Sequence, residues 1–151
     1  MKNFKKVVLT ILLGVAVILP SSVYALTEVK NEEELKNAIK DGGEIVLQDN
    51  ITLTDIIEIK DGNVIINMNS KNITIEKGAF KIFKGKVEFT GKGTIKDVRE
   101  GNSCTVGAYG STNLKDSEYT TLNIGKDVTI DTTQWGVCLR NAVKDNKVAY
   151  G

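Results

Sequence analysis

The sequence predicts an all-β solenoid, a fold in which short strands form the successive sides of a coil. Between Glu44 and Lys96, apolar and polar residues alternate in short pulses such as Ile73-Thr-Ile75 and Val87-Glu-Phe89. A pulse of this length is too short for a helix, and its alternation is typical of a strand with one buried face. The breaks hold Asp, Asn, Gly and Lys but almost none of the two-residue turns that connect hairpins. The corners of a coil therefore explain the pattern better than a meander does.

Strands of one type recur at a loose interval of about 19 to 23 residues, which predicts about four turns. One line of strand starts contains Ile45, Val64, Val87, Val106 and Val128, and a parallel line contains Ile51, Ile73 and Thr94. The alternation also predicts an interior of branched and aromatic residues, which suit a pleated wall. These are Ile45 or Val46, Ile57, Ile59, Val64, Ile66, Met68, Ile73, Ile75, Phe80, Ile82, Val87, Phe89, Ile95, Val106, Ala108, Leu122, Ile124, Val128 and Ile130.

Residues 1–25 have the pattern of a secretion signal. Three lysines within the first six residues form a basic head, the apolar run from Val7 to Leu19 follows, and Val23-Tyr-Ala25 offers a small-x-small cleavage site. This run is too short for a transmembrane anchor, since a bilayer core needs about twenty residues. We therefore expect a secreted or cell-surface protein that begins at Leu26 and has no membrane span after cleavage.

The charge balance argues against nucleic acid as a partner. Loss of the three signal lysines changes the formal net charge from +1 to about −2, and the charged residues are scattered. A protein that binds a polyanion is expected to show a basic excess or a basic stripe instead.

Residues 26–43 are predicted to be an extended lead-in followed by a helix that caps the first coil. Asn31 is a good N-cap with Glu34 three residues on, and Gly42-Gly43 provides a left-handed exit after Lys40. The helix has one narrow apolar stripe, formed by Leu35, Ala38 and Ile39. We expect this stripe to cover the exposed end of the coil, because a solenoid needs its terminal unit covered.

The two cysteines of an exported chain raise the question of a disulfide. Cys104 shares the phase of Val106 and is expected to point inward, whereas Cys138 precedes Leu139 and is expected to point outward. Side chains on opposite faces do not meet the geometry of a disulfide, so the pattern favours two free thiols over a Cys104–Cys138 bridge.

A resemblance to a known family rests on the stretch from Ile66 to Ile75, together with Glu44 to Leu53 and Phe89 to Ile95. These segments resemble the opening turns of right-handed parallel β-helix proteins of the pectate-lyase-like superfamily, particularly the secreted and surface repeat proteins of bacteria. The resemblance covers Glu32 to Leu139 and implies a right-handed parallel β-helix over residues 44–151. It implies little about activity, because this architecture carries lyases, hydrolases, adhesins and phage spikes alike. Ser70 stands where glycine is usual in the turn.

The sequence predicts no catalytic residue, metal site or cofactor. The chain has no histidine, which excludes histidine-based nucleophile activation and histidine zinc sites. A polysaccharide lyase or hydrolase needs converging carboxylates, and the chain has no Asp-Asp or Asp-x-Asp pair. If the stacked coils bring Asp97, Asp127 and Asp131 together on one wall, a catalytic role is not excluded.

Three outward aromatic residues are the candidate ligand-binding residues, because flat rings stack on sugars and anchor protein contacts. They are Tyr109 at the end of its strand, Tyr119 in a polar loop from Ser111 to Thr120, and Trp135 before a later strand. The sequence thus favours an exported, non-catalytic module, an adhesin-like or spacer element for glycans or for host or envelope proteins. The alternative is a carbohydrate-active enzyme or its amino-terminal part. Corner asparagines, among them Asn50, Asn63, Asn72 and Asn123, are expected to form an internal amide ladder with a structural role.

The last residues resemble the approach to another strand. Lys147-Val-Ala-Tyr150 is apolar and extended in pattern, with no amphipathic helix or proline to close the stack. Of three alternatives, a coil that is incomplete at this end is favoured over a fold-back of Val143 to Gly151 and over an end that docks on a partner. An uncovered last coil also predicts end-to-end self-association.

Overall fold

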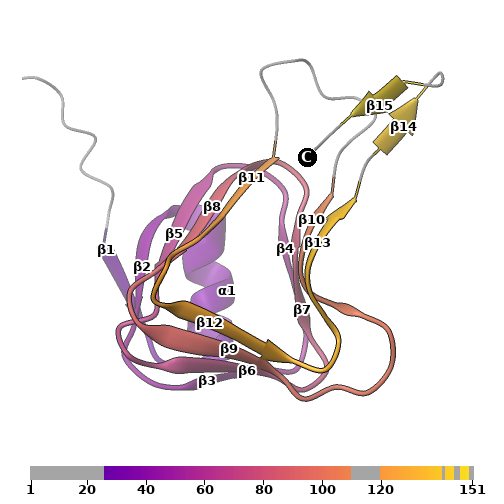
Figure 1. The fold of residues 1–151 in the computed structure, drawn as a ribbon. Coiled ribbons are helices and arrows are strands. Elements are labelled where there is room, and N and C mark those ends of the chain that lie inside the picture. The colour runs from indigo at the N-terminus through magenta and orange to yellow at the C-terminus, as the bar shows by residue number, and fades with distance from the viewer. Residues whose placement is uncertain (1–25, 110–119, 141, 145–146, 150–151) are drawn as a thin grey trace, which may run out of the picture.

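The computed structural model describes residues 26–109, 120–140, 142–144 and 147–149. Its strands form three parallel sheets around a triangular coil, which Figure 1 shows along the coil axis. Sheet A has the order β1 (Leu26–Val29), β2 (Gly43–Leu47), β5 (Asn63–Asn67), β8 (Gly85–Thr90), β11 (Thr120–Ile124). Sheet B has the order β3 (Ile51–Leu53), β6 (Asn72–Ile75), β9 (Gly93–Asp97), β12 (Val128–Thr132). Sheet C has the order β4 (Ile56–Ile59), β7 (Ala79–Ile82), β10 (Cys104–Tyr109), β13 (Trp135–Arg140). Separately from these sheets, β14 (Ala142–Lys144) and β15 (Lys147–Ala149) form an antiparallel hairpin.

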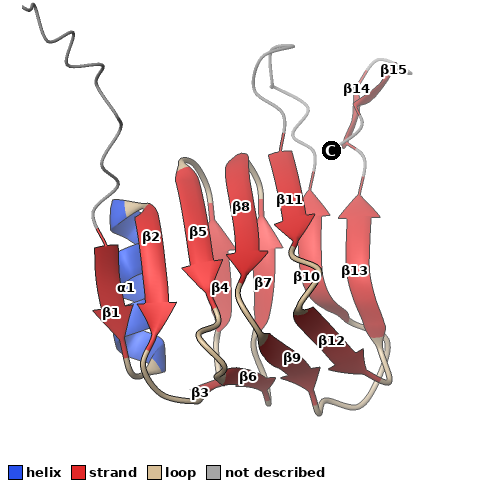
Figure 2. Ribbon diagram, turned by 60° about the vertical axis from the view of Figure 1, so that its left-hand side comes forward, coloured by secondary structure: helices blue, strands red, loops and turns tan. Residues whose placement is uncertain are grey.

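The predicted parallel β-helix with four coils is confirmed, since each coil takes one strand from each sheet (Figure 2). Ile51 lies beside Ile73 in sheet B, and Ile73 lies beside Ile95, one residue after the predicted Thr94. The line through Ile45, Val64 and Val87 was correct as a line of sheet A strands, although Ile45 lies beside Ile66 and not Val64. Its extension to Val106 and Val128 was wrong. Those two residues lie in sheets C and B, and β11 is the next strand of sheet A. The regular spacing of about 19 to 23 residues ends there, because the connection between β10 and β11 is longer than the connections between the earlier strands.

The interior is a continuous apolar core, as the alternation predicted. The predicted residues from Ile45 to Ala108 are buried, as is Val128, whereas Leu122, Ile124 and Ile130 of the last coil are only partly buried. Further interior positions are Val29, Leu47, Ile51 and Leu53. Apolar side chains of similar size stack on one another in successive coils. Each coil therefore has a similar cross-section, which keeps the strands of the three sheets in register.

Helix α1 (Glu32–Asp41) begins and ends as its sequence predicted. The Asn31 Oδ1 accepts a hydrogen bond from the Glu34 backbone N–H at 2.9 Å, and the Glu34 carboxylate accepts one from the Lys30 N–H at 2.8 Å. Gly42 ends the helix with a φ of 74°. The stripe of Leu35, Ala38 and Ile39 is buried, and α1 packs against β1, β2, β3 and β4 at the start of the coil. The lead-in is a strand, β1, paired with β2.

A carboxylate attaches this helix to the first coil. Glu32 accepts hydrogen bonds from the Thr54 hydroxyl at 2.8 Å and from the Asp55 backbone N–H at 2.9 Å, and it forms an ion pair with Lys36 at 3.1 Å. Burial opposes ionisation of Glu32, but the hydrogen bonds outweigh it and lower the pKa of this carboxyl. The helix is thus fixed in orientation as well as in position.

Two of the four corner asparagines form the expected structural ladder, but on the outer corner. The Asn50 Oδ1 accepts from the Asn72 N–H at 2.8 Å, and the Asn72 Oδ1 accepts from the Thr94 N–H at 3.1 Å, each across 22 residues. Each amide thereby accepts a hydrogen bond from a backbone N–H of the next coil.

The corner at Ser70 is formed without the usual glycine. Asn69 and Ser70 have left-handed backbones with φ values of 46° and 60°. We expect Ser70→Gly to raise the free energy of unfolding by up to about 1 kcal/mol, because relief of left-handed strain of about 1 to 2 kcal/mol exceeds the added flexibility of the unfolded chain. Urea unfolding of Ser70→Gly beside Ser70→Ala checks this expectation. A glycine variant no more stable than the alanine variant would contradict it.

Candidate functional surface

The outer face of sheet C carries a stacked pair of aromatic rings. Phe83 follows β7 and Tyr109 ends β10, and their ring centroids lie 5.4 Å apart with an interplanar angle of 25°. A Cβ at Gly107 would lie 2.6 Å from the Tyr109 Cε2, so glycine lets this ring lie against the strand. Tyr109 is half-buried in consequence. This predicted binding residue thus has a clear packing role on the wall of the coil.

Trp135 is the most exposed of the predicted binding aromatics that the structure describes. It begins β13, and 56% of its surface is exposed. Trp135 pairs with Cys104, whereas Tyr109 pairs with Arg140, so the two aromatics lie at opposite ends of the paired strands β10 and β13. Tyr119 lies outside the described residues, as does the predicted loop apart from Thr120, which begins β11. The structure therefore does not bring Tyr109 and Trp135 together in one site.

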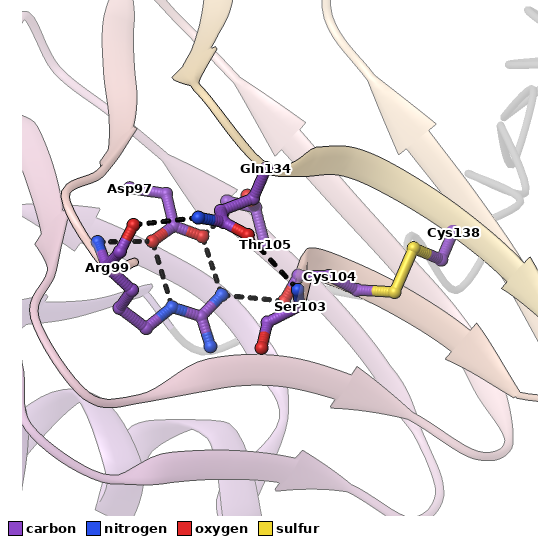
Figure 3. Close-up of a disulfide and its surroundings, with 7 residues drawn as sticks. All are labelled: Asp97, Arg99, Ser103, Cys104, Thr105, Gln134 and Cys138. Carbon is purple, nitrogen blue, oxygen red and sulfur yellow. Dashed lines mark hydrogen bonds and ion pairs between the residues drawn. A yellow bond between two sulfur atoms is a disulfide. The ribbon is translucent and has the colours of Figure 1, made fainter. Parts of the chain in front are cut away.

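A disulfide joins Cys104 to Cys138 and links the third coil to the fourth (Figure 3). The two Cα atoms lie 5.9 Å apart. The prediction of free thiols was therefore wrong, and so was the inward direction assigned to Cys104.

The prediction failed because the alternation of β10 breaks next to Cys104. The Thr105 hydroxyl donates a hydrogen bond at 2.8 Å to Asp97, which lies inside the coil, and the following residue, Val106, stacks in register on the interior Phe80. Two consecutive residues thus face inward. When two consecutive residues face inward, the inward–outward alternation shifts by one residue, and the side chains before them face the opposite way from that predicted. Cys104 therefore lies on the outer face, as Cys138 does.

A buried polar cluster supports the corner beside the disulfide (Figure 3). The Asp97 carboxylate accepts two hydrogen bonds from the Arg99 guanidinium, at 2.8 and 2.6 Å, in addition to that from Thr105. Arg99 also donates to the Cys104 carbonyl at 2.8 Å, and the Gln134 amide donates to the Arg99 carbonyl at 2.8 Å. These bonds tie the end of β9, the start of β10 and the turn before β13 into one unit.

The charges in this cluster stabilise each other. Burial of Asp97 opposes its ionisation, but the hydrogen bonds from Arg99 and Thr105 outweigh burial and lower the pKa of the carboxyl. The hydrogen bond to Asp97 raises the pKa of Arg99. The Asp97 carboxylate is bound by side chains of the protein itself, Arg99 and Thr105, and the Asp97 side chain is fully buried. This cluster therefore supports the surface and is closed to a ligand from solvent.

The three acids that stacking could have gathered on one wall do not converge. Asp97 points into the coil, whereas Asp127 and Asp131 are exposed on the fourth coil. Within the described ranges, no group of three or more Cys, Asp or Glu side chains is placed to hold a metal ion. Sequence reasoning missed Phe83 and the role of Arg99; the Asp-x-Arg spacing from Asp97 was the available signal for the second.

Comparisons with known proteins add no relative: no family model, no curated protein and no solved structure matches this chain. In the part of the chain that the structure describes, no helix is both long and apolar enough to cross a membrane.

Proposed function

We propose that this protein is an exported β-helical module that binds glycans or proteins through the outer surface around Trp135. The observation that carries the proposal is the 56% exposure of this indole on a strand that a disulfide fixes to the preceding coil. An aromatic side chain on a rigid support loses little conformational freedom on binding and offers a large contact area. Such anchors dominate the energy of many interfaces.

Export is supported by two independent features. Residues 1–25 have the composition of a secretion signal. The Cys104–Cys138 disulfide is of the kind that persists in oxidising compartments and is rare in reducing ones. Together these two features support a secreted or cell-surface location as part of the proposal.

Kinship with the pectate-lyase-like superfamily belongs to the same proposal. It is supported by the three-sheet parallel coil and by the likeness of the stretch from Ile66 to Ile75 to the opening turns of those proteins. No observation on the described residues favours the alternative of a carbohydrate-active enzyme.

A binding assay with a matched control tests the proposal. The purified chain from Leu26 would be titrated against a panel of acidic and neutral polysaccharides and envelope proteins. We expect Trp135→Ala to weaken binding at least about tenfold, which corresponds to about 1.4 kcal/mol. Ile56→Ala removes an apolar side chain of similar exposure, 45%, from the first strand of the same sheet and should leave binding unchanged.

Circular dichroism would establish that both variants fold. Absence of binding to every member of the panel would contradict the proposal, as would equal losses in the two variants. Release of unsaturated products that absorb in the ultraviolet, with calcium present, would favour the enzyme alternative instead.

A further inference from the structure

A groove runs between helix α1 and strand β4 in the first coil, and we call it the helix–strand groove. Its volume is about 880 Å³, and residues 54–61, which include the whole of β4, form one wall. Figure 2 shows β4 as the strand of sheet C nearest to α1. The lining from the helix consists of Lys36, Ile39 and Lys40. Three apolar residues of the lining are almost fully buried and form its floor: Ile39, Ile57 and Ile59.

The edge of β4 that faces this groove has no strand partner in the described chain. Sheet C ends at β4, whose neighbour is β7. The Ile59 carbonyl accepts a hydrogen bond from the Phe83 N–H at 2.8 Å, so the backbone groups of Ile59 point toward β7. Successive residues of a strand direct their N–H and C=O groups to opposite sides. The backbone groups of Ile56 and Glu58 therefore point toward the groove.

The surroundings of this edge leave room for one strand and not for a further coil. In sheet A, the corresponding edge is filled, because β1 pairs with β2 in parallel. The described chain before β4 lies in β1, α1, β2 and β3, so no described segment occupies the groove. A further coil would collide with α1, which packs against β2, β3 and β4. A helix beside an unpaired strand edge is an arrangement that recognises extended peptides by strand addition.

The charges of the groove favour an acidic occupant. Each carboxylate of the lining is paired with a lysine: Asp55 with Lys36 at 3.0 Å, Glu58 with Lys60 at 3.0 Å, and Asp61 with Lys84 at 3.5 Å. Lys40 and Lys77 also line the groove, and neither forms an ion pair with a described residue. The groove therefore keeps an excess of positive charge, which complements acidic side chains.

We infer that the helix–strand groove binds an extended acidic segment of a partner polypeptide, which joins sheet C as a strand beside β4. The N–H and C=O groups of Ile56 and Glu58 bond to the backbone of this segment, since a strand presents both kinds of group at the matching spacing. Its acidic side chains contact Lys40 and Lys77. The inference is independent of the binding role proposed for Trp135, which lies in the fourth coil.

Fluorescence anisotropy with labelled peptides tests the inference on the purified chain from Leu26. The first probe is a short peptide in which valine alternates with glutamate, and the second has lysine in place of each glutamate. We expect the acidic peptide to bind in the micromolar range. The basic peptide should bind at least about tenfold more weakly, because its side chains repel Lys40 and Lys77.

A proline substitution tests whether the occupant pairs with β4. Glu58→Pro removes an N–H that faces the groove and places a ring on the free edge, and it should raise the Kd of the acidic peptide at least about tenfold. Because this N–H does not bond to β7, the edge should tolerate proline, and circular dichroism would verify the fold. Glu58→Ala removes the same carboxylate but keeps the N–H, and should bind the peptide as the parent chain does.

N-methylated peptides apply the same test without altering the protein. Two versions of the acidic peptide carry N-methyl groups on alternate residues, one in each phase. The version whose blocked groups face β4 should lose binding, whereas the other should keep it.

Four results would overturn the inference. The acidic peptide does not bind, it binds equally well to Glu58→Pro, or neither N-methylated version loses binding. A concentration-dependent dimer of the chain that Glu58→Pro abolishes would show that a strand of a second copy occupies the groove instead.

Discussion

Gly85→Ala is expected to lower the free energy of unfolding by about 3 to 5 kcal/mol, whereas Gly62→Ala should lower it by about 1 to 2 kcal/mol. Both glycines have left-handed backbones, with φ values of 93° and 95°, so both substitutions incur conformational strain. A Cβ at Gly85 would in addition collide with the Gly62 carbonyl of the preceding coil, whereas a Cβ at Gly62 meets nothing within 4 Å. The collision is with backbone, which cannot rotate away.

Urea unfolding of the two alanine variants measures the difference, because the shared backbone strain cancels between them. The Gly62 carbonyl accepts a hydrogen bond from the Lys86 N–H at 3.0 Å, so displacing it also weakens the connection between coils. Equal destabilisation by the two substitutions would show that the coils adjust their spacing at this corner.

Asp97→Leu is expected to lower the free energy of unfolding by about 3 to 5 kcal/mol, although it places an apolar side chain where the preceding coils also have one. Asp97 lies beside Ile75 in sheet B, at a position where the first two coils have apolar side chains. Leucine suits that column, but the substitution leaves the Arg99 guanidinium, whose side chain is only 14% exposed, without its carboxylate. The cost therefore arises from the unpaired cation and not from packing.

The double variant Asp97→Leu/Arg99→Leu separates these causes. It removes both charges, so it should recover most of the lost stability in thermal or urea unfolding. If the double variant is as unstable as Asp97→Leu, the hydrogen bonds to Thr105 or to the backbone matter more than the charge pair.

The same pair predicts a dependence of stability on pH. The pKa of Asp97 is lower in the folded chain than its usual value, so its contribution is fully present above the unfolded-state pKa of about 4. It is lost as the pH falls from there through the folded-state pKa. Glu32 contributes in the same direction. Between pH 5 and 2, the double variant should therefore lose less stability than the parent chain, while Glu32→Gln removes only the helix contribution.

The walls of this coil were predictable because strand alternation is local. Ile73-Thr-Ile75 shows which face is buried without reference to any neighbour, and the Asn31 and Glu34 pair marks a helix start in the same local way. The phase of Cys104 was not predictable, because two consecutive inward residues follow it and Thr105 faces inward through its hydrogen bond to Asp97, eight residues away in sequence.

The candidate surface was predictable only in part. Trp135 is 56% exposed, but the sequence does not show which corner residues meet on adjacent coils. Phe83 and Tyr109 stack because the register of β7 and β10 brings their ends together. That register depends on the length of the connection between the strands, and this connection differs from coil to coil.

The disulfide also sets how far this molecule can be extended by force. Backbone hydrogen bonds between coils run along the coil axis, so tension along this axis would separate the strands of neighbouring coils one at a time. Cys104 and Cys138 are 34 residues apart in sequence, and the covalent link withholds that segment from stretching. At about 3.4 Å per residue, roughly 115 Å of contour length stays inaccessible until the disulfide is reduced. Under mechanical load the oxidised chain therefore extends less than the reduced chain.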